Sequence, residues 1–295
     1  MESKKNSDKG RKDYLDTSVV RPLLASGRQY REYLEKSVSE RRYISPYICM
    51  EFRRGLLLPM CQFFFDLRND AFPCTEDVIS YWSNKVSDRE VRAILRLVTE
   101  ILHCGQLDLS TKEGKGLAMY AVADFIDRLE TMLDAKFKDT GQNSTGCPRT
   151  TPRAIVNSET PELDLEAFCN AFENTAEAAA KCSIVDFIAA NRTKMAACVK
   201  HASDLERNGM KSANEAFMTL AESLERAMKS ARCSCRACAQ IGDAIIALDK
   251  PTDMHLVHTD RSMTPLCGRL GIPHVPLENE AAFVKKLKSE SAATP

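Results

Sequence analysis

The sequence lacks an excess of charge of either sign. Its 41 lysine and arginine residues balance its 41 aspartate and glutamate residues, so the chain has no overall basic field of the kind that attracts nucleic acids. A contact with nucleic acid would therefore need a local basic patch. Net charge alone excludes no class of partner.

Long hydrophobic runs are also missing. Residues 1–13, MESKKNSDKGRKD, contain no apolar stretch of the kind found in signal peptides, and no later window approaches the roughly 18 uninterrupted apolar residues of a membrane span. We therefore expect a cytoplasmic protein without a membrane partner. The 12 cysteines are dispersed along the chain, and without an export signal we expect reduced thiols rather than disulfides.

Apolar residues are nevertheless abundant enough for a large core. The 295 residues are 44% hydrophobic, which suffices for one large domain or two ordinary ones. Short stretches near both ends have strand character: DYLDTSVV, RRYISPYICM, MHLVHTD and IPHVPL. Each is bounded by polar residues, proline or glycine and is too short for a typical helix. With helical segments between them, these strands predict an α/β fold.

The middle of the chain has a helical pattern instead. From about residue 75 to 232, apolar residues recur at spacings of three and four. The amphipathic segments are 91–102, 122–133, 163–180, 184–207 and 212–232. Residues 141–161 are rich in glycine, proline, serine and threonine, and we expect a mobile loop there.

We expect the two ends to join in one domain, because about sixty residues alone would make a marginal core. Residues 12–60 are the predicted first part of this α/β domain and residues 233–285 its second part. Residues 61–232 are predicted to form a large helical insertion. The predicted flexible tails are 1–11 and 286–295.

Four acidic residues stand out by their position along the chain. Asp16 ends the first predicted strand, Glu51 follows YISPYICM, Asp243 lies near the start of a helix in IGDAIIALD, and Asp260 ends the late strand in LVHTD. Open α/β sheets place ligands at the carboxyl ends of their strands. Converging carboxylates are costly unless they are solvated, paired or bound to a cation, and oxygen-only ligation favours Mg²⁺ or Mn²⁺ over zinc.

Each acid also has a simpler interpretation when it is taken alone. Asp16 or Asp243 could cap a helix, and Asp260 could begin a turn before Arg261. Asp249 and Asp253 flank Lys250-Pro251 and are expected in a solvated turn. His255 and His258 flank the late strand, and we do not include them in the predicted site.

Taken together, LDTSVV, ISPYICMEF, IGDAIIAL and HLVHTDRSMTPLCGRLGI resemble the successive motifs of PIN-domain nucleases, in the family's order. The resemblance covers about residues 12–60 and 236–280. It implies a Rossmann-like three-layer α/β/α sandwich with a central parallel sheet, and Mg²⁺- or Mn²⁺-dependent cleavage of RNA. The implied metal-binding quartet is Asp16, Glu51, Asp243 and Asp260, supported by the hydroxyls of Thr17, Ser18 and Thr259.

The resemblance suggests an endoribonuclease of toxin or defence type that acts on tRNA or mRNA. Two alternatives are a non-catalytic interaction protein that uses the helical block and a PIN-like nuclease that cuts DNA. The helical insertion departs from the family, and it could form a homodimer surface, hold the substrate or bind an inhibitory protein partner.

Two further patterns bear on binding. Arg226, Lys229, Arg232 and Arg236 recur at helical spacing, and Arg53 and Arg54 follow Glu51. These side chains could contact RNA phosphates, or the stripe could be a solvated helix face paired with Glu222 and Glu225.

Cysteine spacing raises the question of zinc. Cys233, Cys235 and Cys238 form a C-x-C-x-x-C cluster, and Cys198 and His201 have C-x-x-H spacing. These residues could bind a structural Zn²⁺, although free cysteines are ordinary small core residues. The remaining cysteines show no such grouping.

Overall fold

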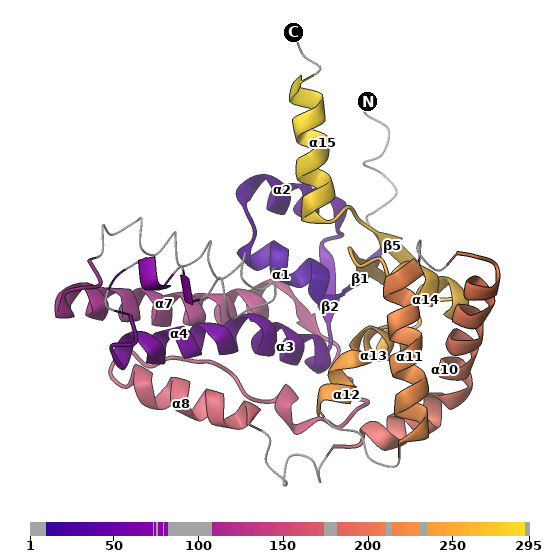
Figure 1. Cartoon of the computed structure of the whole chain (residues 1–295), viewed down its shortest axis with the longest axis horizontal. Helices are drawn as coiled ribbons and strands as arrows, with labels where there is room; N and C mark the ends of the chain where they lie inside the picture. Colours follow the sequence, from indigo (N-terminus) through magenta and orange to yellow (C-terminus); the bar gives the residue numbers. More distant parts are fainter. Residues whose placement is uncertain are drawn as a thin grey trace. The chain divides into compact units, whose positions relative to one another are not determined.

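The computed structural model of this chain describes residues 10–72, 74, 76–78, 80–81, 108–173, 182–210, 214–230 and 235–292. The chain divides into two compact units. Unit 1 comprises residues 1–49, 137–150 and 174–295, and unit 2 comprises residues 50–136 and 151–173. Figure 1 shows the helices and strands along the chain.

Unit 1 contains a five-stranded sheet in which every strand is parallel to its neighbours, in the order β3-β2-β1-β4-β5. The strands are β1 (Lys12–Leu15), β2 (Arg41–Ile44), β3 (Lys138–Asp139), β4 (His255–His258) and β5 (His274–Pro276). Tyr14 of the central strand pairs with Tyr43 of β2 and Leu256 of β4. Tyr14 and Leu256 are fully buried, as expected for parallel strands that are covered on both faces. The α/β class is therefore confirmed.

Helices connect these parallel strands, because parallel neighbours cannot be joined by a tight hairpin. The helices α1 (Thr17–Ala25) and α2 (Arg28–Ser37) lead from β1 to β2, and α14 (Met263–Leu270) leads from β4 to β5. In its described residues, unit 1 also contains α10 (Ile184–Arg207), α11 (Glu215–Lys229), α12 (Cys235–Gln240), α13 (Gly242–Asp249) and α15 (Glu280–Ala292), with a short 3-10 turn at Pro148–Thr150.

All regular secondary structure in the described part of unit 2 is helical. The chain enters it within α3 (Pro46–Phe52) and continues through a π-helical turn at Arg53–Leu57 into α4 (Leu58–Arg68). Helix α4 packs against α7 (Lys112–Lys136) and α8 (Pro161–Phe172). Arg53 and Glu130 form a buried ion pair in this core, with Nε 2.8 Å from Oε1.

The first two strands end earlier than the sequence predicted. Val19 and Val20 belong to helix α1, and the segment ICM of RRYISPYICM belongs to α3. Both valines are fully buried, so burial of a helical face outweighs their intrinsic preference for strands. The edge strand β3 was not predicted, because two residues are too few to show an alternating pattern.

The boundaries of the two units also differ from those of the predicted helical insertion, residues 61–232. Residues 137–150 and 174–232 belong to unit 1, because β3 extends its sheet and α10 contacts α11 and α14. Helix α10 coincides with the predicted segment 184–207, whereas segment 91–102 lies outside the described residues. The predicted tails are partly structured, since Arg11 binds Asp13 and α15 includes residues 286–292.

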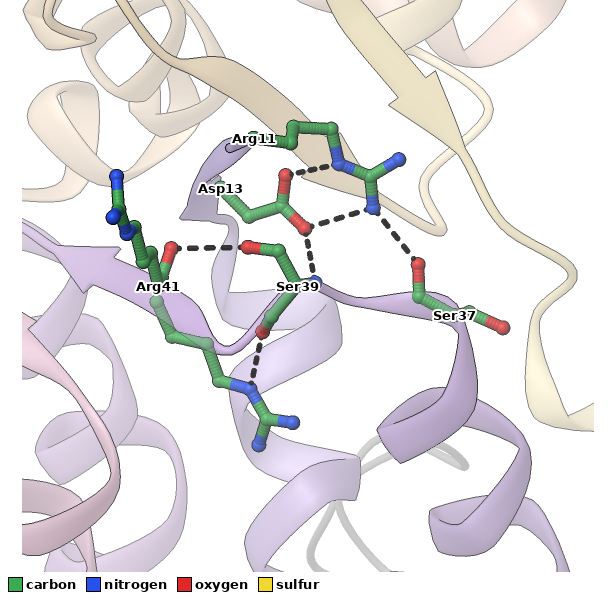
Figure 2. Close-up of polar contacts among 6 residues, drawn as sticks. Arg11, Asp13, Ser37, Ser39 and Arg41 are labelled. Carbon is green, nitrogen blue, oxygen red and sulfur yellow. Dashed lines mark hydrogen bonds and ion pairs between the residues drawn. The ribbon is translucent and has the colours of Figure 1, made fainter. Parts of the chain in front are cut away.

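A polar network holds the segment before β2 against β1 (Figure 2). The buried carboxylate of Asp13 accepts hydrogen bonds from Arg11 Nε at 2.7 Å and from the Ser39 N–H at 2.7 Å. Arg11 also donates to the Ser37 carbonyl at 3.0 Å, and Arg42 donates to the Ser39 carbonyl at 2.9 Å. The charge of Asp13 is thus compensated within the fold.

No helix within the described ranges is long and apolar enough to cross a membrane.

Candidate functional site

Strands β1 and β4 lie side by side at the centre of the sheet, where the strand order changes direction. Strands β2 and β3 lie on one side of this pair, and β5 lies on the other. Such a switch point leaves a crevice at the carboxyl ends of the strands, and open α/β sheets bind ligands there. Asp16 directly follows β1, and Thr259 and Asp260 directly follow β4.

Asp16 both follows a strand and caps a helix. Its backbone N–H donates to the Val257 carbonyl of β4 at 3.0 Å. Its carboxylate accepts the Ser18 N–H at 3.1 Å in the first turn of α1 and also binds the Ser18 hydroxyl. The side chain is buried, so capping stabilises α1 and fixes the direction of the carboxylate.

Ser18 and Thr259 connect the two strand ends. The Thr259 N–H donates to Ser18 Oγ at 3.0 Å, and Thr259 Oγ1 donates to the Ser18 carbonyl at 3.3 Å. Both hydroxyl residues were predicted to support the carboxylates. Thr17, the third predicted hydroxyl, is buried as the first residue of α1.

Asp243 lies in the first turn of α13, but it is not the cap of that helix, which is Ile241. Its carboxylate instead accepts a hydrogen bond from Ser262 Oγ at 2.5 Å. Burial raises the pKa of Cys267 in α14 to about 12, and the carboxylates of Asp16 and Asp243 both add to this rise. Asp16 and Asp243 come from distant segments of the chain, and both raise the pKa of this buried thiol.

His258 was left out of the predicted site, yet it fixes the backbone of Asp260. The ring donates from Nδ1 to the Asp260 carbonyl at 3.0 Å, because a carbonyl oxygen can only accept. Burial, together with the stacked ring of His274 at 5.5 Å, lowers the pKa of His258 to about 4. The imidazole is therefore neutral near pH 7. Its Nε2 has no hydrogen-bond partner in the part of the chain that the structure describes.

The structure assigns three of the four predicted acids to unit 1. Asp16, Asp243 and Asp260 belong there, and Asp243 is bound to Ser262, two residues after Asp260. Glu51 is half-buried near the end of α3, in unit 2.

The donors suit a hard divalent cation in chemistry, since carboxylates and hydroxyls offer only oxygen. Among the described residues, however, no three His, Cys, Asp or Glu side chains are grouped closely enough to hold one ion. Mg²⁺ is commonly bound through one or two carboxylates, with water and substrate phosphates completing the shell. A site of this open type would need only one or two of the acids that follow β1 and β4.

The predicted basic residues are in different environments. Arg53, a possible RNA contact, is buried and paired with Glu130, so its guanidinium is not exposed to a phosphate backbone. Arg54 is half-buried. On α11, Lys229 pairs with Glu225 at 2.6 Å. Arg226 donates to the Glu222 backbone carbonyl and to the Ser223 hydroxyl. The side chains of Arg232 and Arg236 lie outside what the structure describes.

Among the described residues, the predicted zinc ligands do not form a metal-binding group. Cys198 is buried on α10 and contributes to the raised pKa of Cys267. The ring of His201 lies 5.8 Å from that of Phe217. Cys238 is buried against Tyr47, with the hydroxyl 3.8 Å from its sulfur. Cys233 and the side chain of Cys235 lie outside the described part of the chain.

Sequence patterns missed several polar residues of this region. Asp249, expected in a solvated turn, is buried and accepts a hydrogen bond from Ser144 at 2.6 Å. Ser262 and Cys267 lie in the motif that carries Asp260, but no spacing rule connects them with Asp243. Asp253 is exposed, as expected, and pairs with Lys12 at 2.5 Å.

Comparisons of this chain with protein-family models, curated proteins and solved structures found no match.

Proposed function

We propose that this protein is a PIN-like, metal-dependent endoribonuclease whose site lies at the carboxyl ends of β1 and β4. One observation supports this most: Asp16 and Thr259-Asp260 follow the two strands that flank the switch point, and Ser18 connects them. The position is the one at which open α/β sheets bind ligands. RNA as substrate, with tRNA or mRNA of a toxin or defence system as the specific class, rests on the resemblance of the motifs alone.

Asp16 and Asp260 would hold the Mg²⁺ or Mn²⁺, with Asp243, also in unit 1, as a further ligand. A bound ion of this kind activates water and neutralises charge on a phosphodiester. The residues around it have positioning roles. Ser18 directs the carboxylate of Asp16, Ser262 directs that of Asp243, and His258 fixes the backbone of Asp260.

Asp16→Asn is a sharp test, because asparagine caps helices about as well as aspartate. The variant keeps the cap of α1 and removes the charge. If capping were the only role of Asp16, the variant would be indistinguishable from the native protein. As a metal ligand, Asp16 should be needed for cleavage, and we expect the rate to fall by more than about 100-fold.

Cleavage is measured on labelled single-stranded RNA, on DNA of the same sequence and on tRNA, with Mn²⁺, Mg²⁺ or a chelator. Asp260→Asn should behave like Asp16→Asn. Asp253→Asn is the matched control, since this exposed aspartate of unit 1 pairs with Lys12. Equal cleavage by the native protein and Asp16→Asn would overturn the site. Cleavage of DNA alone would establish the DNA-nuclease alternative, and no metal-dependent cleavage of any substrate would favour the interaction protein.

A further inference from the structure

Two cysteines of unit 1 that are far apart in the sequence face each other. The Ser183 N–H donates to the Thr145 carbonyl at 3.0 Å, which joins the loop after β3 to the start of α10. Gly146 has a positive φ of 54° and lies so close that an added Cβ would be 2.8 Å from Ser183 Oγ. This close approach brings Cys147 to Cys182, and a hydrogen bond joins their thiols.

The surroundings of the two sulfurs differ. Cys182 is half-buried and directly precedes the first turn of α10. The hydrogen bond from Cys147 lowers the pKa of Cys182 to about 6. Burial opposes this shift, whereas the Ile184 N–H and the positive charge of Arg149 assist it. Cys147 is buried, and the shared hydrogen bond and burial raise its pKa. Cys182 is therefore the thiolate, and Cys147 is the thiol that donates to it.

Unit 2 contains a second thiol pair that provides an internal comparison. Cys61 of α4 is fully buried and shares a hydrogen bond with Cys169 of α8. That bond lowers the pKa of Cys169, but burial and the carboxylates of Glu173 and Glu166 oppose the shift. A thiolate at Cys169 is thus surrounded by negative rather than positive charge, which disfavours the reactive form.

We propose that Cys147 and Cys182 form a redox-active dithiol site that reacts with peroxides and closes to a disulfide. A half-exposed thiolate beside a second thiol is the arrangement typical of redox-sensing cysteines. This inference does not rest on the proposed nuclease activity.

The reaction has two steps. The Cys182 thiolate attacks one oxygen of hydrogen peroxide, the O–O bond breaks, and the other oxygen leaves as hydroxide. Cys182 is now a sulfenic acid. The Cys147 sulfur then attacks the Cys182 sulfur, the S–O bond breaks, and hydroxide leaves and combines with the Cys147 proton as water. The two thiols lose two electrons to the peroxide, and a thiol reductant reverses the change.

The disulfide would link the loop after β3 to the residue that precedes the N-cap of α10. Ser144 in that loop binds the buried Asp249 at the end of α13. Oxidation would therefore restrain a segment that already contacts two helices of unit 1.

The test uses the full-length reduced protein, limiting hydrogen peroxide, alkylation of the remaining thiols and mass spectrometry of the peptides. We expect a disulfide between Cys147 and Cys182 to form before any between Cys61 and Cys169. At pH 7, Cys182 of the native protein should be alkylated about tenfold faster than Cys169.

Single-cysteine variants establish the order of the steps. Cys147→Ser should accumulate a sulfenic acid at Cys182 that dimedone traps, whereas Cys182→Ser should give neither trapped acid nor disulfide at Cys147. Cys169→Ser is the control and should oxidise like the native protein. The proposal fails if peroxide leaves Cys147 and Cys182 alkylatable in the native protein, or if Cys61 and Cys169 oxidise first. Because these outcomes are read in the native chain, they do not depend on the variants folding.

Discussion

The backbone N–H of Thr259 donates a hydrogen bond to the hydroxyl of Ser18 over 3.0 Å, although the two residues are 241 positions apart. The same hydroxyl binds the carboxylate of Asp16. One small side chain thereby joins the end of β4 to the start of α1 and holds the acid that follows β1. Its removal should affect the site more than the rest of the fold.

Ser18→Ala removes the hydroxyl but keeps the backbone N–H that Asp16 caps. We expect nuclease activity to fall by about 10- to 100-fold, as is usual when a residue that orients a metal ligand is removed. The free energy of unfolding should fall by about 1 kcal/mol for the lost hydrogen bonds. The control is Ser26→Ala at the other end of α1, where the hydroxyl binds the Pro22 carbonyl. Equal activity of both variants would contradict the positioning role.

Asp13→Ala should strongly destabilise unit 1. The substitution leaves the buried Ser39 N–H without its acceptor and separates Arg11 from its partner. We expect a loss of about 3 kcal/mol in the free energy of unfolding, measured by chemical denaturation. Asp253→Ala, which removes the exposed partner of Lys12, should hardly change stability. If the loss for Asp13→Ala were as small as that expected for Asp253→Ala, the network in Figure 2 would contribute little to stability.

The Arg53–Glu130 pair allows a double-mutant cycle in unit 2. Glu130→Leu should cost about 3 to 5 kcal/mol, because it leaves a buried guanidinium without its carboxylate. Adding Arg53→Met should recover much of that loss, since no buried charge then remains. Full recovery is not expected, because the Ala154 N–H also donates to Glu130 at 2.9 Å. Additive losses in denaturation curves would mean that the two side chains are not coupled.

His258 should make stability depend on pH below neutrality. Its pKa is lowered to about 4 in the folded protein, against an ordinary value of about 6.5. The unfolded chain therefore binds a proton first as the pH falls. The contribution of His258 to the free energy of unfolding is therefore fully present above about pH 6.5. It decreases by roughly 2 to 3 kcal/mol as the pH falls to about 4. His274 and Asp260 are the titratable neighbours that act on the ring.

His258→Asn is the matched variant for this effect, because its amide can donate to the Asp260 carbonyl in place of Nδ1. We expect its unfolding free energy to change less between pH 6.5 and 4 than that of the native protein. Parallel stability curves for the two proteins would exclude His258 as the group responsible.

Local sequence patterns predicted much of the secondary structure. The late strands, the helix over 184–207 and the position of Asp243 in a first helical turn all follow from short-range periodicity and are present in the structure. Ends of elements were less predictable. The valines after Asp16 favour a strand by propensity, but helix α1 buries them equally well.

Long-range proximity was not readable from the sequence. The spacing of Cys233, Cys235 and Cys238 suggested a zinc site, whereas Cys147 and Cys182, which share a hydrogen bond, have no common motif. Likewise, the sequence allowed Arg53 as a possible RNA contact, and its buried pairing with Glu130 of another helix was not readable from it.

The sequence alone determined that this chain forms an α/β fold with acids at the ends of two strands, because strand and helix periodicities act over a few residues. Only the tertiary structure decided that β1 and β4 are neighbours, that Ser18 meets Thr259 and that Cys147 faces Cys182. These relationships depend on strand order and on packing between segments that are distant along the chain, and no local pattern encodes either.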